Sequence, residues 1–131
     1  MRKQLTGTER SLELATRVAH IAEDRKGRDI SIREVDQLVD YADYLIFVTG
    51  ANRRQVQAIA DSIEGEMREE GRRTKLEGYE TGWWVLLDLG DVLIHILQPE
   101  AREFYDFDAL WADAPAVKLP AARTRDLKAA P

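Results

Sequence analysis

The residues with the clearest chemical potential lie between positions 82 and 105, in the segment GWWVLLDLGDVLIHILQPEAREFY. Within it, Asp88 and His95 pair a carboxylate with an imidazole, the combination that proteins use for general acid–base chemistry. Catalysis by such a pair also needs a nucleophile or a metal, and no serine in the chain is placed to complete a triad. The pair is therefore compatible with a catalytic, a structural or a recognition role.

Two further features raise the question of a bound ligand. Asp88 and Asp91 are near enough in sequence to hold a magnesium ion between them, although Asp91 is more simply explained as a turn residue. Gly50 separates an apolar strand from a helix start, as in phosphate-binding loops. However, no Lys-Ser/Thr pair follows Gly50, so the P-loop motif is incomplete. We expect no metal site and no cofactor.

A predicted β-hairpin positions these carboxylates and the imidazole. Gly90-Asp91 is a two-residue turn with glycine first, flanked by alternating apolar residues. The predicted core face is aliphatic: it pairs Leu89 with Val92, Leu87 with Ile94, and Val85 with Ile96. The other face pairs Asp88 with Leu93, Leu86 with His95, and Trp84 with Leu97. Diagonal neighbours on adjacent strands lie within reach of a side-chain hydrogen bond, so Asp88 and His95 are expected to interact.

The two adjacent tryptophans, Trp83 and Trp84, help to predict the role of the hairpin face that carries Asp88 and His95. Because side chains alternate along a strand, Trp83 and Trp84 are expected to point to opposite faces and not to share one core. An exposed indole flanked by Leu86 and Leu97 has the composition of an interaction hot spot. The alternative is that a helix of the same domain covers this face.

The helix that follows the hairpin contributes Arg102 and Tyr105, which are three positions apart and therefore share a side. Arg102 is expected to pair with Asp88 or with a carboxylate of a partner, while Tyr105 packs on the sheet. A purely structural brace is an equally good interpretation of these two residues.

The other hydrophobic patterns predict the elements around the hairpin. We expect helices over 11–26 and from the N-cap Asn52 to Gly71, and a short helix from Pro99 through Tyr105. Strands are expected over 29–33, 44–49 and 72–77, and a loop over 78–82. Leu110-Trp111 is expected to anchor the chain end. This order predicts an α/β fold with a mixed sheet of about five strands flanked by helices. We expect a flexible arm over residues 1–10, the folded domain over 11–113, and an Ala/Pro-rich disordered tail over 114–131.

Composition narrows the class of protein. A chain of 131 residues with 44% hydrophobic residues is long enough for one domain with one good core. It contains no cysteine, which excludes disulfides and thiol catalysis and is compatible with a reducing cytoplasm. No apolar run approaches the roughly 20 residues of a membrane span, and the N-terminus lacks a signal-peptide pattern. We therefore expect a cytoplasmic protein with no membrane contact.

The charge balance bears on the partner. The net charge of −5 is unlike that of a nucleic-acid-binding protein and suits a basic partner surface. A local exception brackets the second predicted helix: Arg53, Arg54, Arg72, Arg73 and Lys75. These cations are either contacts to RNA phosphate or solvated charges that balance the acidic residues of that helix.

Taken together, several motifs resemble the ribosomal silencing factor family (RsfS, the Iojap-like proteins) over residues 11 to 117. They are Tyr41-Ala42-Asp43-Tyr44 through Thr49-Gly50, Arg54-Gln55-Val56, Glu77-Gly78, Gly82, Trp84-Val85-Leu86-Leu87-Asp88, Gly90-Asp91, His95, Arg102, Phe104-Tyr105 and Leu110-Trp111. The resemblance implies a mixed α/β fold similar to nucleotidyltransferases but without their catalytic carboxylates. It also implies a non-enzymatic translational repressor. Such a protein binds ribosomal protein fourteen of the large subunit and blocks association with the small subunit when nutrients run short.

The resemblance also assigns positions to the contact surface. Trp84, Asp88, His95, Arg102 and Tyr105 occupy signature positions, and Gly78, Tyr79 and Leu86 are expected to surround Trp84 at the partner contact. The chain departs from the family pattern at Asn52, usually serine, and at Leu97, usually phenylalanine, so Leu97 is a weaker candidate for a contact. A homodimer through the same apolar patch is expected in the free state, and a nearby contact with ribosomal RNA is possible in the bound state. The alternative function is a nucleotide- or metal-dependent enzyme of nucleotidyltransferase type that uses Asp88, Asp91 and His95.

Overall fold

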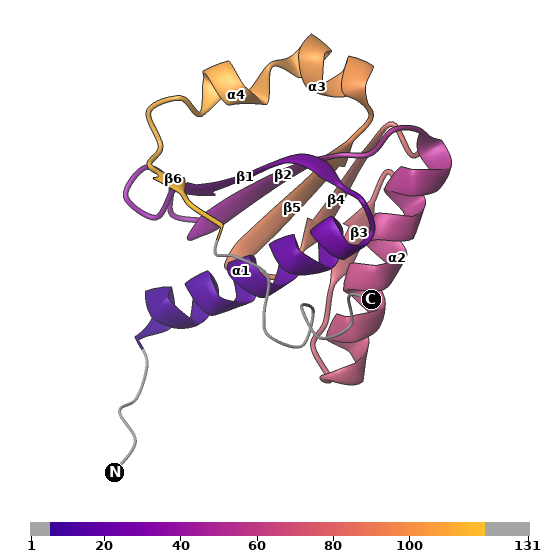
Figure 1. Ribbon diagram of the computed structural model, residues 1–131. Coiled ribbons are helices and arrows are strands. Elements are labelled where there is room, and N and C mark those ends of the chain that lie inside the picture. The colour runs from indigo at the N-terminus through magenta and orange to yellow at the C-terminus, as the bar shows by residue number, and fades with distance from the viewer. Residues whose placement is uncertain (1–5, 120–131) are drawn as a thin grey trace, which may run out of the picture.

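A six-stranded mixed sheet organises the fold, and helices cover both of its faces (Figure 1). The computed structural model describes residues 6–119. The elements are α1 (Gly7–Asp24), β1 (Arg28–Glu34), β2 (Tyr44–Thr49), α2 (Arg53–Glu69), β3 (Lys75–Glu77), β4 (Trp84–Asp88), β5 (Val92–Leu97), α3 (Pro99–Tyr105), α4 (Phe107–Leu110) and β6 (Ala116–Val117). The strand order is β3-β4-β5-β2-β1-β6. Only β2 and β5 pair in parallel among these described strands. The predicted α/β class with a mixed sheet is confirmed.

The two faces of the sheet carry different cores. Helices α1 and α2 cover one face (Figure 1) and pack on fully buried aliphatic residues, among them Ile46, Ile94 and Ile96. The short helices α3 and α4 lie over the opposite face, where a smaller cluster gathers around Phe47 and Phe107. The second face therefore has much less helix above it than the first. Within residues 6–119, no helix is both long enough and apolar enough to cross a membrane.

Helix α1 begins earlier than the sequence analysis expected. The Thr6 hydroxyl accepts a hydrogen bond from the Glu9 N–H (3.1 Å), and the Glu9 carboxylate accepts one from the Thr6 N–H (3.0 Å). This reciprocal capping box starts the helix at Gly7. The predicted arm over residues 1–10 is thus wrong for residues 7–10, and residues 1–5 lie outside the described range.

Strand β6 corrects the prediction for the C-terminal segment. Ile32 pairs with Val117 and Arg33 with Ala116, and the Glu34 N–H donates to the Pro115 carbonyl at 2.9 Å. Proline lacks an N–H but keeps its carbonyl, so it can sit beside a strand at a sheet edge. The sheet therefore has six strands instead of about five. The remainder of the predicted tail, residues 120–131, lies outside the described range.

The predicted hairpin and its register are confirmed. Trp84 lies opposite Leu97, Leu86 opposite His95, and Asp88 opposite Leu93. The Leu89 N–H donates to the Val92 carbonyl at 3.0 Å to close the turn, and Gly90 has φ +95°, which favours glycine.

Candidate partner-binding surface

One side of the hairpin is only partly covered by the protein itself. We call Trp84, Leu86, Asp88, Leu93 and His95 the hairpin face, because all five project from β4 and β5 to the same side and all five are partly buried. Their neighbours on the other side are fully buried: Val85, Leu87, Val92, Ile94 and Ile96. The alternation of exposure shows that α1 and α2 seal one side of this hairpin, whereas α3 and α4 leave the other partly open.

Trp84 lies at the covered end of the hairpin face. Its indole N–H donates to Nδ1 of His95 at 3.0 Å, and its ring lies 4.8 Å from that of Tyr105 and 5.3 Å from that of Phe107 between centroids. These contacts come from α3 and α4. Helices of the domain therefore cover the indole in part, and the remaining part is exposed. The role of Trp84 as an interaction hot spot stays a prediction.

The expectation that the adjacent tryptophans point to opposite sides is wrong. Both indoles contact Tyr105, with centroid distances of 6.0 Å for Trp83 and 4.8 Å for Trp84. The reason is that β4 begins at Trp84, so Trp83 precedes the strand and follows Gly82, which has φ +66°. The rule of alternation does not apply to a residue outside the strand.

His95 is held as a neutral, structural imidazole. Because the indole N–H can only donate, Nδ1 of His95 must accept and carries no proton. The ring stacks on Phe47 with centroids 5.0 Å apart, and burial lowers the pKa of His95 from 6.5 to about 4. A low folded-state pKa means that protonation opposes folding, so the stability conferred by the neutral ring declines as pH falls from 6.5 toward 4.

The expected interaction between Asp88 and His95 is wrong. The Asp88 carboxylate accepts from the N–H of Gly90 at 2.8 Å and so caps the turn, while His95 is engaged by Trp84. Asp91 uses its backbone carbonyl to accept from Asp43 and Tyr44. Among residues 6–119 no group of three or more His, Cys, Asp or Glu side chains is arranged to hold a metal ion. The geometry therefore gives the acid–base and metal interpretations no support.

Arg102 serves as an internal brace. Its guanidinium donates to both carboxylate oxygens of Asp108 at 3.2 and 3.0 Å, to the Thr49 hydroxyl at 3.0 Å and to the Asp29 carbonyl. The Arg102 hydrogen bond lowers the pKa of Asp108. The expected pairing of Arg102 with Asp88 is wrong, and with only 12% of its side chain exposed Arg102 has little surface to offer a partner.

Gly78 and Tyr79 shape the loop that leads into β4. Gly78 has φ +78°, and a Cβ at this position would lie 2.3 Å from the Trp84 carbonyl oxygen, so only glycine fits. Tyr79 packs against the core beneath α1 and α2, where its hydroxyl donates to Asp61 at 3.0 Å. Tyr79 is thus directed away from the hairpin face, although the chain brings Gly78 against the backbone of Trp84.

Phe107 is the residue that the sequence analysis missed. It is 9% exposed, and its ring stacks on Phe47 at 5.3 Å and lies 5.4 Å from His95. Asp106, with φ +50°, reverses the chain between α3 and α4 and directs Phe107 onto the sheet. The sequence offers no local signal for this role, because the partners of Phe107 come from β2 and β5.

Large apolar side chains continue the hairpin face onto α3 and α4. Phe104 is 73% exposed, Tyr105 is 38% exposed, and Leu110 is 69% exposed. The Phe104 ring lies 6.2 Å from Trp83, so the exposed aromatics join the cluster around the indoles. Contiguous exposed apolar areas often mark surfaces that bind other proteins. The hairpin face and these neighbouring side chains are therefore our candidate partner-binding surface.

Comparisons with known proteins assign the chain to a family. Residues 8–131 match the model described as "Ribosomal silencing factor during starvation", RsfS. The chain belongs to the ribosomal silencing factor family. It is 36% identical over 108 residues to the ribosomal silencing factor RsfS of Halalkalibacterium halodurans, a match that covers 82% of this chain and 92% of that protein.

A solved structure agrees with this chain in fold, and a further relative extends the range of organisms. A crystal structure of a Chromobacterium violaceum protein superposes with a TM-score of 0.73 at 32% identity and covers 93% of this chain and 99% of that one. A mouse protein named mitochondrial assembly of ribosomal large subunit protein 1 is 30% identical over 88 residues, which span 64% of this chain and 39% of the mouse protein. The family resemblance found in the sequence is confirmed.

The residues that the sequence analysis assigned to the partner contact separate into two groups in this structure. His95, Arg102 and Gly78 hold the local architecture through the contacts described above. Leu86, Asp88 and Tyr105 present surface on or beside the hairpin face. Leu97, which the family resemblance marked as a departure from the usual phenylalanine, is fully buried and so belongs to the core.

Proposed function

We propose that this silencing factor binds the large ribosomal subunit through its ribosomal protein fourteen and blocks association with the small subunit under nutrient limitation. Family membership supports a ribosomal target, and the family description refers to starvation. The name of the mouse relative refers to assembly of the large ribosomal subunit. The observation that carries the proposal is the half-open hairpin face, which presents apolar residues that no helix among residues 6–119 fully covers.

The proposed contact centres on Leu86 and Leu93, with Trp84, Asp88 and Tyr105 around them. The first two are partly exposed aliphatic side chains on adjacent strands, and aromatic rings border them on the side of α3. The net charge of −5 suits a basic partner, and complementarity of this kind speeds and orients association. We assign His95, Arg102, Gly78 and Tyr79 an indirect part, because their side chains or backbone support the loop and helices that frame this contact.

The proposed mechanism is steric and involves no chemistry, no cofactor and no enzymatic activity. A domain bound to the joining surface of the large subunit occupies the space that the small subunit needs, so the two subunits cannot associate. We propose that the protein acts in the cytoplasm and that, when bound to the large subunit, it also contacts ribosomal RNA beside the protein contact. When it is not bound to the subunit, we propose that it forms a homodimer through the hairpin face. Dimerisation through that face would compete with binding to the subunit.

A subunit-joining experiment tests this function. Purified protein is incubated with large subunits, small subunits are added, and the formation of joined ribosomes is followed by light scattering and by sucrose-gradient sedimentation. We expect the protein to sediment with large subunits and the joined fraction to fall as the protein concentration rises. Full joining at a protein concentration that saturates the large subunits would refute the proposal.

A further inference from the structure

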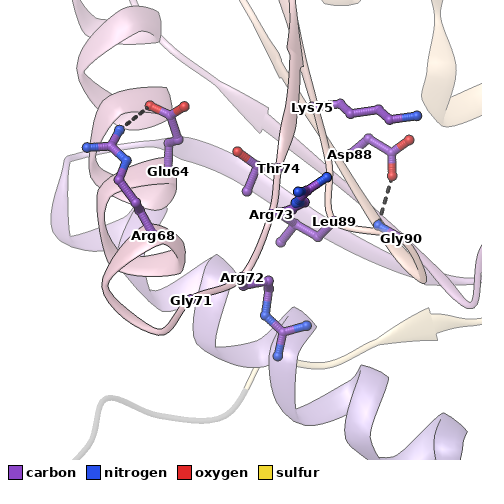
Figure 2. A pocket seen from close by; sticks show the side chains of 10 residues that line it. All are labelled: Glu64, Arg68, Gly71, Arg72, Arg73, Thr74, Lys75, Asp88, Leu89 and Gly90. Carbon is purple, nitrogen blue, oxygen red and sulfur yellow. Dashed lines mark hydrogen bonds and ion pairs between the residues drawn. The ribbon is translucent and has the colours of Figure 1, made fainter.

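A cleft at the β3 edge of the sheet differs in chemistry from the hairpin face. The cleft has a volume of about 770 Å³ and lies between the end of α2, the segment that enters β3, and the β4–β5 turn (Figure 2). Four cationic side chains line it, Arg68, Arg72, Arg73 and Lys75, against the two acidic side chains Glu64 and Asp88. This local excess of positive charge stands out in a chain whose net charge is −5.

The local sequence builds the cationic wall of the cleft. Gly71 has φ +76°, its N–H donates to the Arg68 carbonyl at 2.9 Å, and the N–H of Arg72 donates to the Met67 carbonyl at 2.9 Å. These two bonds form a Schellman motif, which ends α2 and turns the chain in a defined direction. Arg72, Arg73 and Lys75 therefore follow one another along one fixed segment (Figure 2).

The acidic side chains of the cleft already have partners, whereas three of the cations do not. Glu64 pairs with Arg68 at 3.0 Å, and Asp88 accepts from the Gly90 N–H at 2.8 Å. Within residues 6–119, the side chains of Arg72, Arg73 and Lys75 make no hydrogen bond and no ion pair, and all three residues are exposed. In the described part of the chain, these side chains can therefore meet an anionic ligand without first giving up an internal bond.

We propose that this cleft binds the phosphate backbone of ribosomal RNA next to the protein contact made by the hairpin face. The inference rests on the proposed function and assigns residues to its RNA contact. Guanidinium groups match phosphate with two parallel hydrogen bonds, and contacts of this type position a protein without reading sequence. The described residues that line the cleft include no aromatic side chain on which a base could stack, so a backbone contact fits the cleft better than a bound nucleotide.

The position of the cleft agrees with this assignment. Asp88 belongs both to the hairpin face and to the cleft lining, so the two surfaces adjoin along β4. A partner protein that lies on ribosomal RNA would place phosphate beside the surface it contacts. In an extended segment, Arg72 and Lys75 are about 10 Å apart, which allows contact with more than one phosphate.

The test compares two triple variants that lose the same charge. The first carries Arg72→Gln, Arg73→Gln and Lys75→Gln in the cleft. The control carries Arg25→Gln, Lys26→Gln and Arg28→Gln, three exposed residues that follow α1. They lie near the start of α2, where the Gln55 amide donates to the carbonyls of Arg25 and Lys26. Dissociation constants of the full-length proteins are measured over a range of salt concentrations, both for purified large subunits and for a protein-free RNA duplex.

We expect the cleft variant to lose salt dependence. Each phosphate contact contributes about 0.9 to the slope of log K against log salt concentration, so three lost contacts lower the slope by about 2.7. This corresponds to a roughly six-fold smaller change in affinity for each doubling of salt. The control variant should keep the wild-type slope, and only the cleft variant should lose binding to the RNA duplex.

The other possible outcomes of these binding measurements distinguish failure of the cleft assignment from failure of the proposed function. Equal slopes for all three proteins on large subunits would overturn the cleft assignment and leave the subunit contact standing. Weaker subunit binding by the cleft variant with unchanged RNA binding would assign the cleft to an acidic protein and also overturn it. Wild-type protein that binds the duplex through the cleft but not the subunit would overturn the proposed function alone. Wild-type protein that binds neither would overturn both.

Discussion

Replacing Leu86 with arginine is expected to abolish co-sedimentation of the protein with large ribosomal subunits while leaving the domain folded. Leu86 lies at the centre of the hairpin face, is partly exposed, and is flanked by His95 and Glu77 on the neighbouring strands. Loss of a central contact residue costs at least about 2 kcal/mol of binding free energy, and a desolvated charge facing a basic partner adds to this cost. Affinity should fall at least about 30-fold.

Two companion variants make the interpretation of Leu86→Arg specific. Leu86→Glu introduces a charge of the opposite sign at the same site, so with a basic partner it should lose less affinity than Leu86→Arg. Leu12→Arg places the same charge on α1, which covers the other face of the sheet, and should bind like the wild type. Thermal melts of all three variants serve as the check that each one is folded. Wild-type sedimentation of a folded Leu86→Arg protein would remove the hairpin face from the contact.

Trp84→Ala is a less informative probe of binding, despite the prominence of this residue in the sequence. Its indole bonds to His95 and packs against Tyr105 and Phe107, so truncation removes internal contacts as well as exposed surface. Large-to-small replacements of such partly buried aromatics destabilise the fold by several kcal/mol. Loss of binding by this variant would therefore not distinguish a contact residue from a structural one.

Phe107→Ala is expected to produce the largest loss of stability among single changes on the side of α3 and α4. The ring is 9% exposed and stacks on Phe47, so its removal leaves a cavity between α4 and the sheet. Replacements of this kind cost about 3 kcal/mol in the free energy of unfolding, equivalent to a fall of roughly 10 °C in Tm for a domain of this size. Urea denaturation monitored by circular dichroism measures the change.

Phe104→Ala is the matched control for this prediction. Phe104 lies three positions earlier, carries the same side chain and is 73% exposed, so its loss should cost less than about 1 kcal/mol. Equal destabilisation by the two replacements would mean that Phe107 does not anchor α3 and α4 to the sheet. In that event the partial cover over Trp84 would need another explanation.

The hairpin shows how much of the candidate site follows from sequence alone. Core-facing and outward-facing residues alternate strictly along the two strands that flank the Gly90-Asp91 turn. This alternation defines how β4 and β5 pair and which face each side chain joins, because a slip by one residue would bury Asp88 and expose Leu87. For this reason the prediction of one aliphatic face and one mixed face was correct. The prediction failed at Trp83, where it extended the strand by one residue beyond its start at Trp84.

Other errors arose where long-range contacts decide the structure. The segment over 116–117 has the composition of a tail, yet it forms β6 because the edge of β1 offers unpaired backbone groups. Two groups that Arg102 contacts, Thr49 and Asp29, belong to β2 and β1, so the residues around Arg102 do not identify them. Phe107 likewise acquires its role only when α4 folds onto Phe47. Local patterns carry no information about such contacts.

Site-specific cross-linking tests most directly whether the hairpin face binds ribosomal protein fourteen. The chain contains no cysteine, so Leu93→Cys on the hairpin face and Leu12→Cys on α1 each provide a unique position for a benzophenone label. After illumination with large subunits, the label at position 93 should yield a cross-link to ribosomal protein fourteen, and the label at position 12 should not. A cross-link to that protein from position 12 alone, or a different protein captured from position 93, would contradict the account.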